Sequence, residues 1–223
     1  MPHTSLLQRK LREAATLFRV SGVLIIMDRI TSIELGRRTM QPSLATDLVD
    51  QARKGNSEAA GMLYEQYYQS IYRYLYYWTG DSNAAEDLTG EVFLKMVKGL
   101  STYQGLENTF KSWLYQIARN LAIDHYRQNV RRPQVPITDD IPTHHDNPET
   151  AAAFSIERAT LRKALLKLNG EQRDVILLRF IEGLPIQEVC QMMKKSDNAV
   201  KGLQRRALEN LRLLLLEMET KHG

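Results

Sequence analysis

The chain has 223 residues, of which 43% are hydrophobic and 25% are charged, an ordinary balance for a folded soluble protein. Its formal net charge of +4 permits a polyanionic partner without requiring one. The single cysteine, Cys190, excludes an internal disulfide and a cysteine-cluster metal site, and it indicates a reducing, cytoplasmic environment. Because Cys190 lies on an apolar helical stripe, we expect it to be a small buried hydrophobe.

Residues 1–43 form an N-terminal extension that carries no recognisable motif, although residues 5–18 have the pattern of a helix. No stretch of the chain approaches the roughly 20 apolar residues that span a bilayer, so we expect no membrane insertion. The apolar run at residues 20–27 follows basic residues, but Arg19 interrupts it and no cleavage pattern follows, which disfavours a signal peptide. A regulatory arm, a docking segment for an inhibitory partner, and sequence upstream of a later start such as Met40 remain open.

Residues 44–127 contain no proline and have helical periodicity throughout, which predicts a first all-α domain. Seven tyrosines crowd its second helix, and because they cannot all face one stripe, some must lie on the surface. The expected helices are 44–54, 57–78, 83–100 and 109–127. Apolar residues at helical spacing are expected to face the core in the last two helices. They are Leu88, Val92, Met96 and Leu100 in the first of these, and Phe110, Trp113, Leu114, Ile117 and Leu121 in the second.

Residues 128–150 contain four of the seven prolines, which disfavour helix and predict an extended linker. The adjacent His144 and His145 lack a third ligand at suitable spacing, so we expect no metal there. Residues 151–216 are helical again, and the expected architecture is two small all-α domains on a tether.

The second domain contains three consecutive helices, the last two separated by a short turn around Lys194. The final helix is apolar on one stripe and basic on the other, the pattern of a helix-turn-helix whose second helix enters a DNA major groove. An ordinary helical hairpin with a solvated basic face is the alternative. The apolar stripe consists of Val200, Leu203, Ala207, Leu211 and Leu214, and the basic side carries Asn198, Lys201, Arg205 and Arg206.

Three segments, in this order, resemble bacterial RNA polymerase sigma factors of the extracytoplasmic-function type. They are AEDLTGEVFLKMVKGL (85–100), FKSWLYQIARNLAIDHYR (110–127) and residues 168–212. The resemblance covers roughly residues 44–215. It implies a sigma region 2 domain at 44–127 and a region 4 domain at 151–216. A protein of this family is not an enzyme and has no cofactor, metal or catalytic residue. It binds core RNA polymerase, recognises the −35 and −10 elements of promoter DNA, and helps to open the duplex.

The resemblance further implies that the helix at 85–100 binds the clamp helices of the largest polymerase subunit. The contacts it implies are Asp87, Glu91, Phe93 and Lys95, although Phe93 fits a core position equally well. Without the resemblance, a solvated acidic helix face would explain Asp87 and Glu91 as well.

The helix at 110–127, together with the preceding loop at 103–108, resembles the family's −10 reading element. Because unstacking a base costs a few kcal/mol, the protein must capture the exposed base in compensation. Asn120 can hydrogen-bond a flipped base edge, and Arg119 and Arg127 can hold phosphates. For Asp124, an ion pair within its own helix is at least as good an interpretation as DNA binding.

The −35 reading residues are expected on the exposed N-terminal half of the last helix. Lysine and arginine can reach guanine edges or phosphates, whereas asparagine and glutamine suit adenine edges. The candidates are Asp197, Asn198, Lys201, Gln204 and Arg205.

Three positions depart from the family pattern. Gly90 replaces a polar, helix-favouring residue and lowers helix propensity by about 1 kcal/mol. Lys194 stands where glycine is common, which predicts a strained or differently closed turn. Pro185 replaces a serine or threonine and supplies no capping oxygen.

A free-standing helix-turn-helix transcriptional regulator is the alternative function, and the segments at 85–100 and 110–127 favour the polymerase subunit. A hydrolase or nuclease is disfavoured because no carboxylate cluster, nucleophile elbow or phosphate-binding loop is present.

Overall fold

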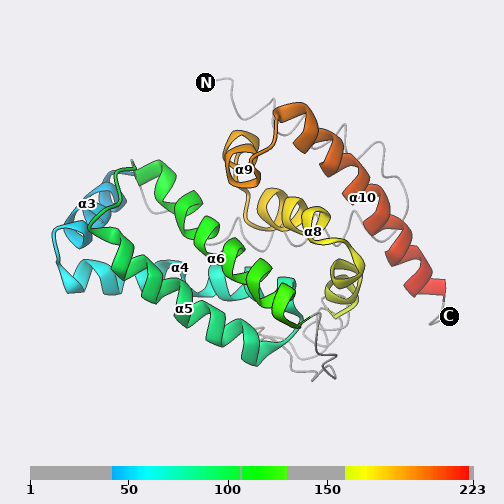
Figure 1. The fold of residues 1–223 in the computed structure, drawn as a ribbon, viewed down its shortest axis with the longest axis horizontal. Coiled ribbons are helices and arrows are strands. Elements are labelled where there is room, and N and C mark those ends of the chain that lie inside the picture. The colour runs from blue at the N-terminus through cyan, green and yellow to red at the C-terminus, as the bar shows by residue number, and fades with distance from the viewer. Residues whose placement is uncertain (1–41, 106, 130–158, 221–223) are drawn as a thin grey trace, which may run out of the picture. The chain divides into compact units, whose positions relative to one another are not determined.

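The computed structural model describes residues 42–105, 107–129 and 159–220, all of which belong to one compact unit spanning Thr39–Gly223. Within these ranges every regular element is helical, which confirms the expected all-α class (Figure 1). We refer to residues 42–129 as the N-terminal module and to residues 159–220 as the C-terminal module. The predicted extension, most of the linker and the His144–His145 pair lie outside the described residues.

The N-terminal module consists of four helices at the expected places. The helix α3 begins at Pro42, two residues earlier than predicted, because the fixed φ of proline suits a first helical turn. Asn56 caps α4 by accepting a hydrogen bond from the Glu58 amide at 2.9 Å, and Gly80 ends α4 in the left-handed conformation. The bounds are Pro42–Arg53 for α3, Ser57–Thr79 for α4, Ser82–Leu100 for α5 and Glu107–Asn129 for α6.

The helices α4, α5 and α6 pack side by side around one apolar core (Figure 1). The stripe predicted on α5 is buried throughout, and Phe110, Leu114 and Leu121 of α6 are buried as expected. Trp113 and Ile117, which were predicted to lie inside, are only half-buried. On α4 the tyrosines divide between core and surface, as predicted. The buried α5 residues are Leu88, Val92, Met96 and Leu100, and the buried tyrosines of α4 are Tyr74, Tyr76 and Tyr77.

The C-terminal module begins with helical residues 159–167 and continues with α8, Gly170–Ile176. A π-helical turn, η1 (Leu177–Ile181), extends α8, and the helices α9 (Ile186–Met193) and α10 (Asp197–Thr220) follow. On α10 the first four predicted stripe residues are buried, but the fifth buried residue is Leu215 rather than Leu214. Counted from Leu211, a step of four residues to Leu215 stays closer to the buried face of the helix than a step of three residues to Leu214.

The turn between α9 and α10 is closed by Lys194, which adopts φ 53° and ψ 45°. It is the one non-glycine residue with positive φ in the described parts of the chain. The strain predicted for this turn is therefore confirmed. Pro185 precedes α9 without a side-chain cap, also as expected. Cys190 is only half-buried, which corrects the expectation of a buried cysteine, because α9 is short and its stripe meets the core at Val189 and Met193.

Candidate functional site

The N-terminal half of α10 presents polar side chains to solvent. Asn198, Lys201 and Arg205 are exposed on one side of the helix, while Val200 and Leu203 are buried on the other. Asp197 and Lys201 form an ion pair at 2.5 Å across one helical turn. The Ser196 hydroxyl accepts a hydrogen bond from the Ala199 amide at 3.3 Å, so a side chain caps the start of the helix.

Gln204 departs from the expected arrangement. It is half-buried rather than exposed, and its Oε1 is buried and has no hydrogen-bond partner among the described residues. Gln204 follows Leu203 and precedes Arg205, so it lies at the border between the buried and the exposed sides of α10. In this conformation Gln204 is not part of the exposed surface with the other −35 candidates.

On α6 the four −10 candidates separate into two groups. Asn120, Asp124 and Arg127 are exposed, and Asp124 pairs with Arg127 at 3.6 Å within the helix. The Asn120 Oδ1 accepts a hydrogen bond from Gln116 Nε2 at 2.9 Å, one turn earlier. Arg119 lies on another side of α6, where its side chain is only 14% exposed. Arg119 is therefore not available at the surface in this conformation.

The partner of Arg119 is Asp174 on α8, a carboxylate that is 1% exposed. Arg119 Nε donates to Asp174 Oδ2 at 2.7 Å, and Asp174 Oδ1 accepts from Trp78 Nε1 at 2.6 Å and from the Tyr74 hydroxyl at 3.1 Å. Burial raises the pKa of Asp174, and the charge of Arg119 opposes this rise. A single carboxylate of the C-terminal module is thus surrounded by donors from α4 and α6.

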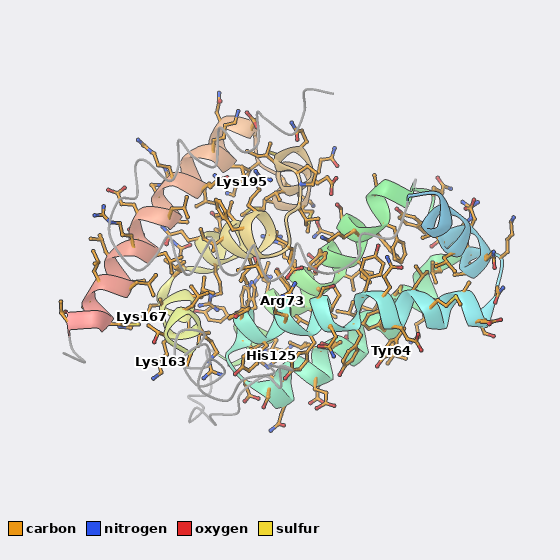
Figure 2. The ribbon with its side chains drawn as sticks, turned by 180° about the vertical axis from the view of Figure 1, so that it is seen from behind. Tyr64, Arg73, His125, Lys163, Lys167 and Lys195 are labelled. Atoms are coloured by element: carbon orange, nitrogen blue, oxygen red, sulfur yellow. The ribbon has the colours of Figure 1, made fainter. Side chains whose placement is uncertain are left out.

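Glu182, which follows η1, makes a second contact of the same kind. Arg73 of α4 (labelled in Figure 2) donates to Glu182 Oε1 through Nη2 at 3.1 Å, and the Tyr115 hydroxyl of α6 donates to Oε2. Lys111 Nζ donates to the Glu182 backbone carbonyl at 2.6 Å. Burial, followed by the negative charge of Glu182, raises the pKa of Tyr115 well above its ordinary value, so Tyr115 remains a donor.

The outer side of α5 carries the residues expected to contact a partner. Asp87, Glu91 and Lys95 are exposed, and Lys95 pairs with Glu91 at 3.5 Å. Phe93 is buried, with its ring centroid 4.7 Å from that of Tyr64, so it supports this face from below. A shallow hollow beside the face is lined by Asp81, Asn83, Ala84, Asp87, Leu88, Glu91 and His125.

Leu94 and Val97 were not identified from the sequence, although they are the most conspicuous apolar residues on α5. They are 63% and 57% exposed and lie three residues apart, on neighbouring positions of the helix surface. Both positions fall outside the buried stripe of α5, a signal that was present in the spacing. Tyr64 of α4, labelled in Figure 2, is also exposed, and its ring lies against that of Phe93. Exposed apolar side chains on one helix, beside charged ones, are typical of a protein-binding surface.

The described residues offer no other site of evident chemistry. No group of three histidine, cysteine or acidic side chains within them could hold a metal ion. None of the helices that the structure describes is long and apolar enough to span a membrane.

Comparison with known families agrees with this arrangement. Residues 63–132 match the Sigma-70 region 2 family, and residues 164–213 match the Sigma-70 region 4 family. The first match covers most of α4, α5 and α6, and the second contains α8, α9 and the first two thirds of α10.

Individual relatives carry the same two regions. The chain is 39% identical over 173 residues to the ECF RNA polymerase sigma factor BldN of Streptomyces coelicolor, covering 76% of this chain but 65% of BldN, slightly under two thirds of that relative's length. It is 33% identical over 171 residues to the ECF RNA polymerase sigma factor SigX of Bacillus subtilis, covering 70% of this chain and 82% of SigX.

Among solved structures, the fold is similar to that of the sigma factor RpoE from Bartonella quintana in complex with the anti-sigma factor NepR. The TM-score is 0.57 at 20% identity, with 70% of this chain and 95% of the other covered. The fold similarity shows the architecture alone, whereas the sequence matches identify the family. The chain belongs to the extracytoplasmic-function sigma factors of bacterial RNA polymerase.

Proposed function

We propose that this chain is an alternative sigma factor that binds core RNA polymerase and directs it to a specific set of promoters. The observation that carries the proposal is the presence of two different surfaces in one chain. The start of α10 exposes Asn198, Lys201 and Arg205 for DNA, while α5 exposes Leu94 and Val97 beside charged residues for a protein partner. A free-standing regulator also needs the first surface and could use the second to dimerise, but the match to Sigma-70 region 2 across α4, α5 and α6 favours polymerase as the partner of the second surface.

In the proposed division of labour, α10 lies in the major groove of the −35 element. Lys201 and Arg205 are one helical turn apart, so both can reach the same short stretch of base edges or phosphates. The ion pair between Lys201 and Asp197 must open when Lys201 binds DNA, and because both groups are well exposed this costs little. Asn198 supplies an amide next to these cations.

The helix α6 is proposed to read the −10 element after the strands separate. Asn120 presents an exposed amide for a flipped base, and Arg127 presents an exposed guanidinium for a phosphate. Arg119 is assigned a phosphate contact as well, which requires that it first leave Asp174.

The face of α5 is proposed to bind the polymerase. Leu94 and Val97 supply buried apolar area, and Glu91 and Lys95 supply charged contacts at the rim. A rim charge contributes little affinity alone, so replacing Leu94 or Val97 should weaken binding more than replacing Asp87. The chain would act in the cytoplasm as a subunit without catalytic activity of its own. Because RpoE of Bartonella quintana forms a complex with an anti-sigma factor, an anti-sigma factor is also a candidate partner here.

Run-off transcription with core polymerase on a genomic promoter library tests the proposal. We expect specific initiation from a small set of promoters with the wild-type chain. The Leu94→Ser variant should lose initiation and co-purification with core enzyme, whereas the control Leu213→Ser, at an equally exposed leucine of α10, should retain both. Tight sequence-specific DNA binding by the chain alone, without any effect on core enzyme, would contradict the proposal.

A further inference from the structure

The start of α10 carries one acidic side chain on the surface that is proposed to read DNA. Asp197 is the only acid among residues 196–206, a segment that also holds Lys201, Arg205 and Arg206. The side chains of Asp197 and Lys201 are 48% and 60% exposed, and Asp197 Oδ2 lies 2.5 Å from Lys201 Nζ. DNA phosphates repel a carboxylate in this place, so Asp197 lowers the affinity for DNA wherever no base compensates it.

The helix does not need this carboxylate for its own cap. Ser196 Oγ already accepts a hydrogen bond from the Ala199 amide at 3.3 Å. The ion pair between Asp197 and Lys201 lies in solvent, where such pairs contribute little to stability. Asp197 is also the first residue of α10, and the N-terminal residues of a recognition helix are those that contact base edges. Reading of a base therefore explains this acid better than stability does.

The ion pair offers a donor and an acceptor side by side, which is the complement of one base-pair edge. In the major groove a G·C pair presents the guanine N7 and O6 acceptors next to the cytosine N4 donor. Guanine O6 and cytosine N4 are hydrogen-bonded to each other at about 2.9 Å, a separation similar to that of the two ends of the ion pair. Lys201 can therefore move to guanine while Asp197 accepts the free N4 hydrogen of the cytosine. Each group exchanges one partner for another on a single base pair.

An A·T pair fits the same two groups less well. Its adenine N6 donor can serve Asp197, and its thymine O4 acceptor can serve Lys201. The carboxylate then lies beside the adenine N7 acceptor, which repels it, and the ammonium lies beside the thymine methyl group, which accepts no hydrogen bond. In a G·C pair the second acceptor, guanine N7, lies on the side of the lysine instead. The two side chains together thus distinguish the two kinds of base pair.

We propose that Asp197 is a specificity-determining residue, which acts with Lys201 to select a G·C pair in the −35 element. This role rests on the proposed function, since it gives the DNA that α10 reads one required base pair. On other DNA, Lys201 can bind a phosphate only by leaving the charge of Asp197 unpaired close to the DNA. The carboxylate therefore weakens binding to the wrong sequence and is compensated on the right one.

Randomising the −35 element of one promoter tests the proposal, with the full chain bound to core polymerase. The promoter is taken from those that the genomic library yields, and the transcribed templates are sequenced. At one position we expect the wild-type chain to prefer G·C over A·T by about fivefold to 150-fold, the range of one good base contact. Asp197→Ala and Lys201→Met should each reduce this preference to less than about twofold at that same position, because the two side chains read one base pair.

The variant Asp197→Asn gives a sharper outcome. An amide suits adenine through N6 and N7, so this variant should shift the preference at the same position toward A·T. Glu209→Gln is the matched control, because it removes the same charge from an exposed residue of α10. Glu209 lies about 18 Å further along the helix than Asp197. The control should leave the preference at every position unchanged.

Two results would overturn this role of Asp197 while the proposed function stands. In the first, Asp197→Asn changes the preference at no position, with helical content intact by circular dichroism, so that Asp197 only stabilises the helix. In the second, Asp197 and Lys201 affect two different positions of the element. A wild-type chain that shows no preference at any −35 position would instead refute the proposed function, and the role of Asp197 with it.

Discussion

Replacing Lys194 by glycine should stabilise the C-terminal module. Lys194 adopts φ 53° and ψ 45°, a left-handed conformation that costs a residue with a Cβ atom about 1–2 kcal/mol. Glycine removes this cost but loses about 0.4–1 kcal/mol through the greater freedom of the unfolded chain. The side chain of Lys194 is exposed, and the turn is closed by its backbone amide and that of Lys195, which bonds to the Cys190 carbonyl at 3.0 Å. The expected net gain is therefore about 0.5–1 kcal/mol.

Urea unfolding followed by circular dichroism measures this gain as a shift of the midpoint at constant slope. The control is Lys98→Gly, at an exposed lysine in the last turn of α5, where the conformation is right-handed and glycine should cost up to about 1 kcal/mol. The two lysine-to-glycine substitutions thus have opposite expected signs. A destabilised Lys194→Gly variant would show that the left-handed conformation is not the source of strain in this turn.

Three further outcomes are expected. Gly90→Ala should stabilise the chain by about 0.5–1 kcal/mol in the same urea assay, because an added Cβ meets no atom within 4 Å. A loss of stability would mean that this position is not free of contacts. Arg205→Ala should weaken binding by about 1–3 kcal/mol and relax preference at one −35 position in gel-shift competition; a uniform loss across all sequences would instead indicate a phosphate contact. Asn120→Ala should leave gel-shift binding to −35 DNA unchanged but reduce the permanganate reactivity of the −10 region, since the base that Asn120 binds is exposed only after strand separation. Normal strand opening by this variant would show that Asn120 is not part of the −10 site.

The helical periodicity of the sequence was sufficient to predict the elements of both modules. The α5 stripe is buried as predicted, because one apolar side chain per turn leaves few alternatives for packing. The strained turn at Lys194 was expected because Lys194 stands where the family commonly has glycine, and its left-handed conformation agrees with that expectation. The errors lie at the border between the buried and the exposed side of α10. Leu215 is buried where Leu214 was expected, and Gln204 is half-buried where it was expected to be exposed. A shift of one position rotates a side chain by about 100° around the helix, so periodicity predicts burial least well for residues at the edge of an apolar stripe.

The roles of single charged residues were harder to predict. Arg119 looked like a surface cation beside Asn120, and nothing local in the sequence distinguishes it from Arg127. Its partner Asp174 is 55 residues away along the chain. Asp174 and Glu182 lie in helices whose apolar patterns explain the fold without them. Pairing across such a distance depends on how two surfaces meet, and the spacing of residues within one helix contains no information about it. The site residues on the exposed surfaces therefore remain predictions.

Arg173, the neighbour of Asp174, connects three elements of the chain through one side chain. Its guanidinium donates to the Leu165, Leu166 and Leu168 carbonyls at 2.9, 2.7 and 3.1 Å, all within the C-terminal module, and to the Trp78 carbonyl at 2.6 Å across the modules. Three of these four bonds lie within the C-terminal module, so Arg173 fixes the helical residues 159–167 to α8. The fourth bond joins the same guanidinium to the end of α4. Lysine has neither the planar fork nor enough donors for four carbonyls, so one substitution, Arg173→Lys, should loosen all of these connections together.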